Sequence, residues 1–394
     1  MGVCENRAMI AAVVGMALAL LSCSQPVVQP SGSWNAKAAA AYLDLRETWW
    51  MQWSGSARDH GTFCVSCHTV LPYALARPSL QSALAQAGPT LEERKLIANI
   101  DKRVRFWNAI GTYYAGPGPD GKSAQSRGTE AILNAVVLAE RDAEIGQLSD
   151  DTHSAFDQMW SLQQTEGNNQ GAWRWLQFDQ EPWEAKQSVY FGACLAALAV
   201  GAAPDKYSST PAIQPNVELL RKYLRRNNTS QSLINRLFLL WAAVKLQGLV
   251  NQTERAAIVN AAFAEQQRDG GWRLAEISWN WHSWTAKSFM NMWLREKGTP
   301  LSGASDGAAT GLVVFALREA GVPQTDPRLQ RGISWLIGHE TADGDWPTES
   351  VNKQKHLSPQ TALFMTDAAT AYAVLALTYP GKHPGSAGPK QHGD

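Results

Sequence analysis

The chain has 394 residues, in which 35 lysines and arginines balance 35 aspartates and glutamates. This neutrality argues against nucleic acid as a partner, because nucleic-acid-binding domains usually carry a basic surface. The length allows one large domain or two, and the 17 tryptophans indicate many large aromatic contacts.

The first residues have the pattern of an export signal. An apolar run over 9–21 is short for a membrane-spanning helix and has the length of a signal-peptide core. It ends in Leu20-Leu21-Ser22-Cys23, which resembles the lipobox of bacterial lipoproteins, where the cysteine is lipidated and becomes the first mature residue. We expect a signal peptide over 1–22, a tether over 23–33, and a protein exported to the bacterial periplasm or outer membrane and held on the membrane by the lipid on Cys23. An ordinary cleaved signal with a chance cysteine is the alternative.

Residues 34–120 contain the chain's clearest cofactor motif. Cys64-Val65-Ser66-Cys67-His68 is a Cys-x-x-Cys-His run, the attachment signature of c-type haem. Each thiol at this spacing can bind one haem vinyl group, and the His68 imidazole then becomes the proximal iron ligand. We expect a helical segment that carries covalent haem c. A Cys64–Cys67 disulfide, which does not require His68, and a metal site are the alternatives.

The second axial ligand of such an iron is harder to predict. Small class-I cytochromes c supply a methionine after the motif, yet no methionine lies between His68 and Met159. We prefer His60, in a glycine-containing loop, although it is equally typical of a solvated surface histidine. An open iron face is a further alternative. The remaining candidate ligands are Met51, His282, Met290, Met292 and Met365.

Helix signals dominate the rest of the chain, and strand signals are nearly absent. We expect helices over 36–53, 90–114, 124–144, 151–164, 184–201, 217–226, 232–246, 252–267, 306–320, 327–337 and 366–378. Some of them are apolar all round and should be buried, whereas others are amphipathic and should lie outside. An inner ring of apolar helices within an outer ring predicts an all-α fold, an α/α toroid, over 121–380. The Gly/Pro-rich tail 381–394 should be disordered.

Three polar loops that end in glycine and tryptophan support this fold. Gln266, Gly271 and Trp272 match the QW repeat of squalene–hopene cyclases, which protein prenyltransferases share more loosely. The other two copies are looser, and they contain Gln163, Gly171 and Trp173, and Gly344 and Trp346. The resemblance implies that these residues staple adjacent repeats and are structural. The Asp-x-Asp-Asp run of hopene cyclases and the zinc ligands of prenyltransferases are missing from the sequence, so the resemblance predicts a fold rather than an activity.

A toroid has a central cavity, and several residues are candidates to line it. Asp306 and Asp367 begin apolar helices, where each is either an N-cap or a buried acid able to donate a proton. The aromatic cluster of Trp279, Trp281, His282 and Trp284 either forms a wall for a ligand or covers the core.

These patterns leave three interpretations open. The first is an exported haem lipoprotein that transfers electrons with a redox partner protein, or performs haem-dependent chemistry on a hydrophobic, isoprenoid-like small molecule. The second is a haem-free toroid enzyme, either terpenoid cyclase-like or carbohydrate-active. The third is a binding lipoprotein without chemistry. The sequence does not decide whether the toroid is catalytic.

Overall fold

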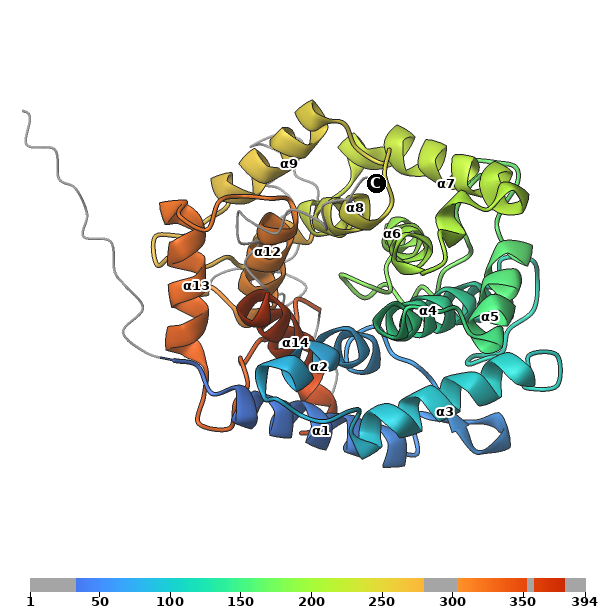
Figure 1. Cartoon of the computed structure of the whole chain (residues 1–394), viewed down its shortest axis with the longest axis horizontal. Helices are drawn as coiled ribbons and strands as arrows, with labels where there is room; N and C mark the ends of the chain where they lie inside the picture. The colour runs from blue at the N-terminus through green and yellow to red at the C-terminus, as the bar shows by residue number, and fades with distance from the viewer. Residues whose placement is uncertain (1–32, 280–302, 353–357, 380–394) are drawn as a thin grey trace, which may run out of the picture.

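The computed structural model describes residues 33–279, 303–352 and 358–379. Within these residues, six inner helices form a ring that six outer helices surround (Figure 1). The inner helices are α2 (Val70–Ala83), α4 (Lys122–Ile145), α6 (Ser188–Ala202), α8 (Leu233–Lys245), α12 (Gly307–Glu319) and α14 (Phe364–Thr378). The outer helices are α1 (Ala36–Gln52), α3 (Leu91–Arg105), α5 (Asp150–Ser161), α7 (Gln214–Asn227), α9 (Gln252–Ala264) and α13 (Pro327–His339). The predicted α/α toroid is therefore confirmed.

Side-chain patterning explains which helices lie inside. Every residue of α12 from Gly307 to Leu317 is buried, because this helix packs against neighbours on all sides. In the outer helix α7 the buried residues are Val217, Leu220, Tyr223 and Leu224, which follow the spacing of one helix face. Burial of these apolar faces in the shared core is what makes the helix pairs depend on one another.

The ring closes between the two ends of the chain. Inner helix α14 packs against α2, and it also contacts the outer helix α1. Residues 34–120, which the sequence analysis set apart from the toroid, supply α1, α2 and α3 and so occupy three positions in the ring. Helix α2 was not predicted from the sequence, because Pro72 and Pro78 lie within it and proline disfavours a helix interior.

The smaller elements lie in the loops. A two-stranded antiparallel hairpin, β1 (Ala57–Arg58) and β2 (Thr62–Phe63), precedes the Cys-x-x-Cys-His run. The short helix α10 spans Leu274–Ile277. Five 3-10 helices cover Asp59–Gly61, Tyr207–Ser209, Pro211–Ile213, Asn228–Ser230 and Thr361–Leu363.

Among the described residues, one stretch, Thr361–Thr378, is long and apolar enough to match a membrane span by composition. It contains α14, whose residues from Met365 to Ala376 are buried in the ring, so the packing of an inner helix accounts for its hydropathy. The predicted signal peptide 1–22, Cys23 and the tail 381–394 lie outside the described residues, as do Trp281, His282 and Trp284.

Candidate functional site

Three long described loops of the ring each connect an outer helix to the following inner helix. Residues 53–69, 106–121 and 162–187 make these connections, whereas α7 is joined to α8 by the short segment 228–232. Segments far apart in the chain meet at this end: the side-chain amide of Asn352 donates to the carbonyl of Glu181 at 2.6 Å and accepts from its N–H at 2.8 Å. We call this end the loop end, and it is where a toroid has room to place functional groups.

The Cys-x-x-Cys-His run lies at the loop end between β2 and α2. Its backbone is fixed by neighbours, because the indole of Trp50 donates to the carbonyl of Cys64 at 2.8 Å. The hydroxyl of Tyr113 accepts from the N–H of Val65 at 3.3 Å. The hydroxyl of Ser66 accepts from the N–H groups of Thr69 and Val70, which begin α2. The loop conformation is therefore set before any ligand binds.

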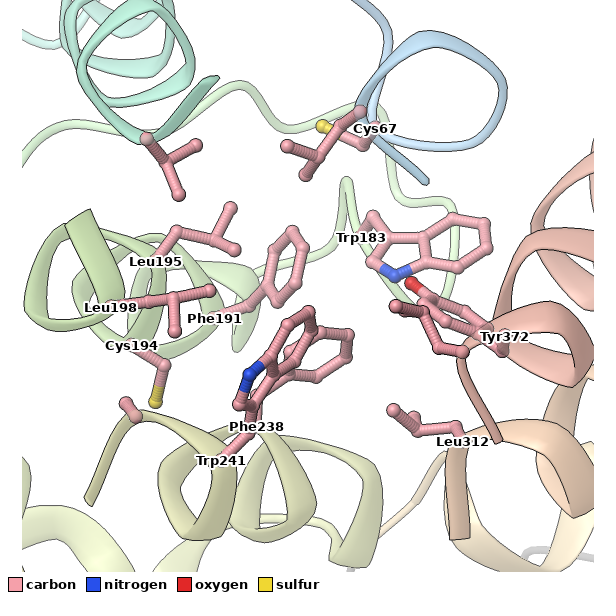
Figure 2. Packing of buried hydrophobic residues seen from close by; sticks show 14 of the residues in the cluster. Cys67, Trp183, Phe191, Cys194, Leu195, Leu198, Phe238, Trp241, Leu312 and Tyr372 are labelled. Carbon is pink, nitrogen blue, oxygen red and sulfur yellow. The ribbon is translucent and has the colours of Figure 1, made fainter. Parts of the chain in front are cut away.

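Both thiols of the run are free and buried, with 5% of Cys64 and 3% of Cys67 exposed. Burial raises the pKa of Cys64 to about 11 and that of Cys67 well above its usual value, so both are neutral thiols at physiological pH. Cys67 belongs to the buried cluster inside the ring that also contains Trp183, Phe191 and Tyr372 (Figure 2). The motif therefore faces the interior of the toroid.

His68 is held by two aromatic rings and one hydrogen bond. Phe364 of α14 stacks on the imidazole, with ring centroids 3.9 Å apart, and Trp50 meets it edge-on at 5.2 Å. Its Nδ1 lies 2.9 Å from the hydroxyl oxygen of Thr69. Burial, and then the Arg46 guanidinium, lower the pKa of His68 to about 3, so the imidazole is neutral at physiological pH.

Trp49, Trp50 and Trp53 pack together beside His68. The Trp49 and Trp53 rings stack with centroids 5.2 Å apart, and each of the three indoles lies near Phe364. These four rings make an aromatic cluster on one side of His68. An apolar surround of this kind limits water access to a metal or cofactor.

Asp367 is not an N-cap, which corrects one prediction. It lies in the first turn of α14, after the N-cap Leu363, and its carboxylate does not bond the helix backbone. Both oxygens are bound instead by Arg46 of α1, at 2.6 and 3.0 Å, and they also accept from the hydroxyls of Tyr42 and Thr69. The sequence could not reveal this arrangement, because Arg46 and Thr69 are distant from Asp367 in the chain.

Asp306 is the N-cap of α12, which is one of the two roles that the sequence analysis offered for it. Its two oxygens accept from the N–H groups of Ala309 at 2.8 Å and Leu274 at 2.5 Å. Burial raises the pKa of Asp306 to about 6, and these backbone bonds oppose the shift. With both oxygens engaged by its own surroundings, Asp306 has a structural role in this arrangement.

The sequence analysis missed one acidic residue at the loop end. The charge of the Glu184 carboxylate adds to the raised pKa of both thiols. Burial raises the pKa of Glu184 to about 7, with Lys122 opposing, and burial also raises that of nearby Glu181 to about 7. The signal in the sequence is the run from Glu181 to Glu184, in which Pro182 and Trp183 separate two acids.

Two other candidate residues, His60 and Trp279, make contacts outside the aromatic cluster around His68. His60 is half-exposed in the turn between β1 and β2, where its Nδ1 pairs with Asp59 at 2.9 Å. No contact between His60 and His68 is found in the described part of the chain, so its role as a distal ligand stays a prediction. Trp279 is partly buried against the core, and its three predicted partners are outside the described residues.

The repeat residues form a joint that recurs between outer helices. Gln266 follows α9, and its amide donates to the carbonyls of Gly270 and of Arg328 in α13, both at 2.8 Å. The indole of Trp272 donates back to the carbonyl of Ala262 in α9 at 2.6 Å. Gln266 thus links the outer helices α9 and α13, and Trp272 bonds the C-terminal end of α9.

The first copy of the joint has the same bonds. Gln163 follows α5, and its amide donates to the carbonyls of Gly171 at 3.1 Å and of Asn216 in α7 at 3.0 Å. The indole of Trp173 donates to the carbonyl of Met159 in α5 at 2.6 Å. The insertion between Gln163 and Trp173 therefore leaves the joint intact.

The third copy closes the ring with a different residue. Trp346 donates to the carbonyl of Leu336 in α13 at 2.8 Å, and the residue six positions before it is Glu340. The Glu340 carboxylate accepts from the N–H of Asn35, the N-cap of α1, at 2.6 Å. The spacing to the tryptophan would have revealed Glu340, which the sequence analysis did not single out.

Comparison with known proteins finds one short sequence match and several loose structural matches. No protein-family model matches the chain. A stretch of 77 residues is 30% identical to a probable squalene–hopene cyclase of Sinorhizobium fredii (strain NBRC 101917 / NGR234). The match covers 19% of this chain and only 12% of that cyclase.

Solved structures described as glycosidases superpose loosely. One glycosidase variant gives a TM-score of 0.47 at 13% identity, and the wild-type glycosidase gives 0.46 at 14% identity. Each alignment covers 87% of this chain and 95% of the glycosidase.

Proposed function

We propose that the protein is an exported c-type haem protein in which the loop end of an α/α toroid holds one covalent haem for electron transfer. The observation that carries this proposal is the state of the three donor groups. Cys64 and Cys67 are free thiols, and the imidazole of His68 is hydrogen-bonded through Nδ1 only, among the described residues.

The donor set fits a haem. The Nδ1 contact to Thr69 leaves Nε2 as the nitrogen for the iron, and Phe364 covers a face of the imidazole rather than its edge. The neutral imidazole that burial favours is the form that binds a metal. Cys64, Cys67 and His68 would hold the group, and the aromatic cluster would shield it from water.

Attachment needs no further reactant. Each cysteine S–H adds across one vinyl C=C bond, so that one C–S bond and one C–H bond form and nothing leaves. The bound haem would supply a one-electron iron couple whose potential depends on its axial ligands and its surroundings. The chain's own residues fix the imidazole, exclude water and keep the thiols neutral until attachment.

Electron transfer fits the site better than chemistry on a ligand in the ring. A cavity of about 440 Å³ lies among the inner helices, and its lining includes Trp241, Phe315, Leu375 and Tyr379. These residues lie toward the C-terminal ends of the inner helices, whereas the thiols lie at the loop end. Thr378, at the edge of that cavity, lies eleven positions after Asp367 along α14, a rise of about 16 Å. An apolar small molecule bound there would be remote from the iron.

The decisive experiment is an absorption spectrum of the protein purified from a host that matures cytochromes c. We expect a Soret band and haem that remains attached on a denaturing gel, and we expect both to be lost in Cys67→Ala. Cys194→Ala is the matched control, because Cys194 is an equally buried thiol on α6 and should leave the haem unchanged. A colourless wild-type protein overturns the proposal.

A second candidate function rests on Glu181 and Glu184. Their pKa values of about 7 make them protonated acids at the loop end at mildly acidic pH, as general acid catalysis requires. This haem-free toroid enzyme would also suit the short similarity to a cyclase. A colourless protein that converts an isoprenoid or a glycoside, and loses this activity in Glu184→Gln, would establish it.

We also propose that a lipid on Cys23 attaches the exported protein to the membrane. The lipobox-like run Leu20-Leu21-Ser22-Cys23 supports this proposal. Labelled palmitate should enter the wild-type protein and not the Cys23→Ala variant. Release of unlabelled wild-type protein into the soluble periplasmic fraction would contradict it.

A further inference from the structure

We propose that Thr69 is a positioning residue that fixes His68 as the Nδ1–H tautomer and links it to the Asp367–Arg46 ion pair, so that the toroid itself tunes the iron ligand. This inference rests on the proposed haem function. It concerns residues outside the Cys-x-x-Cys-His run: Thr69, which precedes α2, Arg46 of α1 and Asp367 of α14.

The geometry is a continuous chain of short contacts. Nδ1 of His68 is 2.9 Å from Oγ1 of Thr69, and that hydroxyl donates to Oδ2 of Asp367 at 2.7 Å. Thr69 is 2% exposed and Asp367 is 1% exposed, so bulk water does not compete for these bonds. The link joins the first residue after the motif to α14.

The ion pair is held from several sides. Arg46 binds Asp367 through Nε and Nη2, at 2.6 and 3.0 Å. Its guanidinium also donates to the side-chain oxygen of Gln360 at 2.6 Å and to the Gln360 carbonyl at 2.9 Å. Tyr42 adds a further donor to the carboxylate at 3.0 Å. Burial raises the pKa of Asp367, and the guanidinium and both hydroxyls oppose that shift. Surrounded by four donor atoms, the carboxylate is the ionised acceptor of the network.

Proton counting then fixes the tautomer of His68. The Thr69 hydroxyl has one hydrogen, and an ionised carboxylate can only accept. The hydroxyl therefore donates to Asp367 and has only a lone pair to offer His68. Nδ1 must carry the imidazole proton, which leaves Nε2 bare for the iron.

The expected effect on the iron follows from ligand basicity. A hydrogen bond accepted from Nδ1–H makes the imidazole a stronger electron donor, which favours the oxidised iron. Removing the acceptor should weaken this donation and raise the reduction potential. Since one hydrogen bond of this kind contributes a modest free energy, the equilibrium constant for reduction should increase about two- to tenfold.

The test compares Thr69→Val with Thr69→Ser in the haem-loaded, full-length protein. Valine keeps the volume and removes the hydroxyl, whereas serine keeps the hydroxyl and serves as the rescue variant. Reduction potentials are measured by spectroelectrochemistry, and the iron–histidine stretch by resonance Raman spectroscopy. We expect covalent haem in both variants, a higher potential and a lower stretching frequency in Thr69→Val, and wild-type values in Thr69→Ser.

Two failures are distinguishable. If the wild-type protein contains no covalent haem, the proposed function fails and this inference fails with it. If all three proteins contain haem and the potential of Thr69→Val equals that of wild type, the haem function stands and the role of Thr69 is overturned. If Thr69→Val does not fold, Asp367→Asn takes its place in the comparison. The reduction potentials of wild type and Thr69→Ser should then agree, and that of Asp367→Asn should be higher. Equal potentials in all three proteins would overturn the inference.

Discussion

Glu340 and Asn35 join the two ends of the helical ring. The Glu340 carboxylate accepts the backbone N–H of Asn35 at 2.6 Å, where the other joints use a glutamine between consecutive outer helices. Because Asn35 caps α1, the same contact that closes the ring also fixes the start of the first outer helix.

The glycine of this joint should be one of the least replaceable residues in the protein. Gly344 has a φ of +83°, and a Cβ added there would lie 2.1 Å from the backbone carbon of Ala38 in α1. We expect Gly344→Ala to lower the free energy of unfolding by more than about 2 kcal/mol, through backbone strain and a clash with α1. Urea unfolding followed by circular dichroism measures this loss.

Gly146 is the matched control for that substitution. Its φ is +80°, and a Cβ there meets nothing within 4 Å. Gly146→Ala should therefore show the backbone strain alone, about 1 kcal/mol. Equal losses in the two variants would mean that the close approach of the joint to α1 is unimportant.

The number of free thiols should reveal the state of the Cys-x-x-Cys-His run. In the mature, lipidated protein with haem attached, guanidinium should expose one reactive thiol, Cys194, because the other cysteines are removed or modified. Titration with Ellman's reagent measures this number, and Cys194→Ala should reduce it to zero.

Other outcomes of the titration have distinct meanings. Three reactive thiols would show that Cys64 and Cys67 carry neither haem nor a disulfide. One thiol that becomes three after reduction would reveal a Cys64–Cys67 disulfide. Before denaturation, burial should slow the reaction of all thiols.

Glu184 should make stability depend on pH. Its pKa is about 7 in the folded protein and about 4.3 in an unfolded chain, so the folded state binds the proton more tightly. Stability from this group is complete below pH 4 and is lost as the pH rises toward 7. Because Glu184 is only partly buried, we expect a total loss on the order of 1–3 kcal/mol.

Glu184→Gln removes this titration. The variant should gain stability relative to wild type between pH 5 and pH 8, measured as the difference in urea midpoints. Glu349→Gln, at an exposed position, is the control and should follow wild type. A Glu184→Gln difference that is constant across this range would refute the raised pKa.

Asp306 should behave as a helix cap rather than as an acid catalyst. Asp306→Ala removes both backbone bonds and should cost about 1–2 kcal/mol of unfolding free energy. Asp306→Asn keeps an acceptor oxygen for the α12 N-terminus and should retain most of the stability. Thermal unfolding of the two variants provides the measurement, and a stable Asp306→Ala protein would contradict the capping role.

The sequence predicted those features that depend on neighbouring residues. Apolar runs such as 306–320 marked the inner helices, and the spacing from Gln266 to Trp272 marked a joint. The same reasoning missed α2, because prolines lie within that helix. It also offered an N-cap role for Asp367, whereas Leu363 is the N-cap of α14. The bonds among Arg46, Thr69 and Asp367 join segments about 300 residues apart, so no local pattern predicts them.

The position of α14 beside α1 has a consequence for biosynthesis. Phe364 and Asp367, which order the imidazole of His68, are translated long after the motif itself has left the ribosome. A nascent or prematurely terminated polypeptide would expose an intact Cys-x-x-Cys-His run whose histidine lacks its stacking ring and its carboxylate. Under the proposed haem function, ordering of this histidine would therefore require completion of α14, and shortened products would carry a poorly ordered ligand.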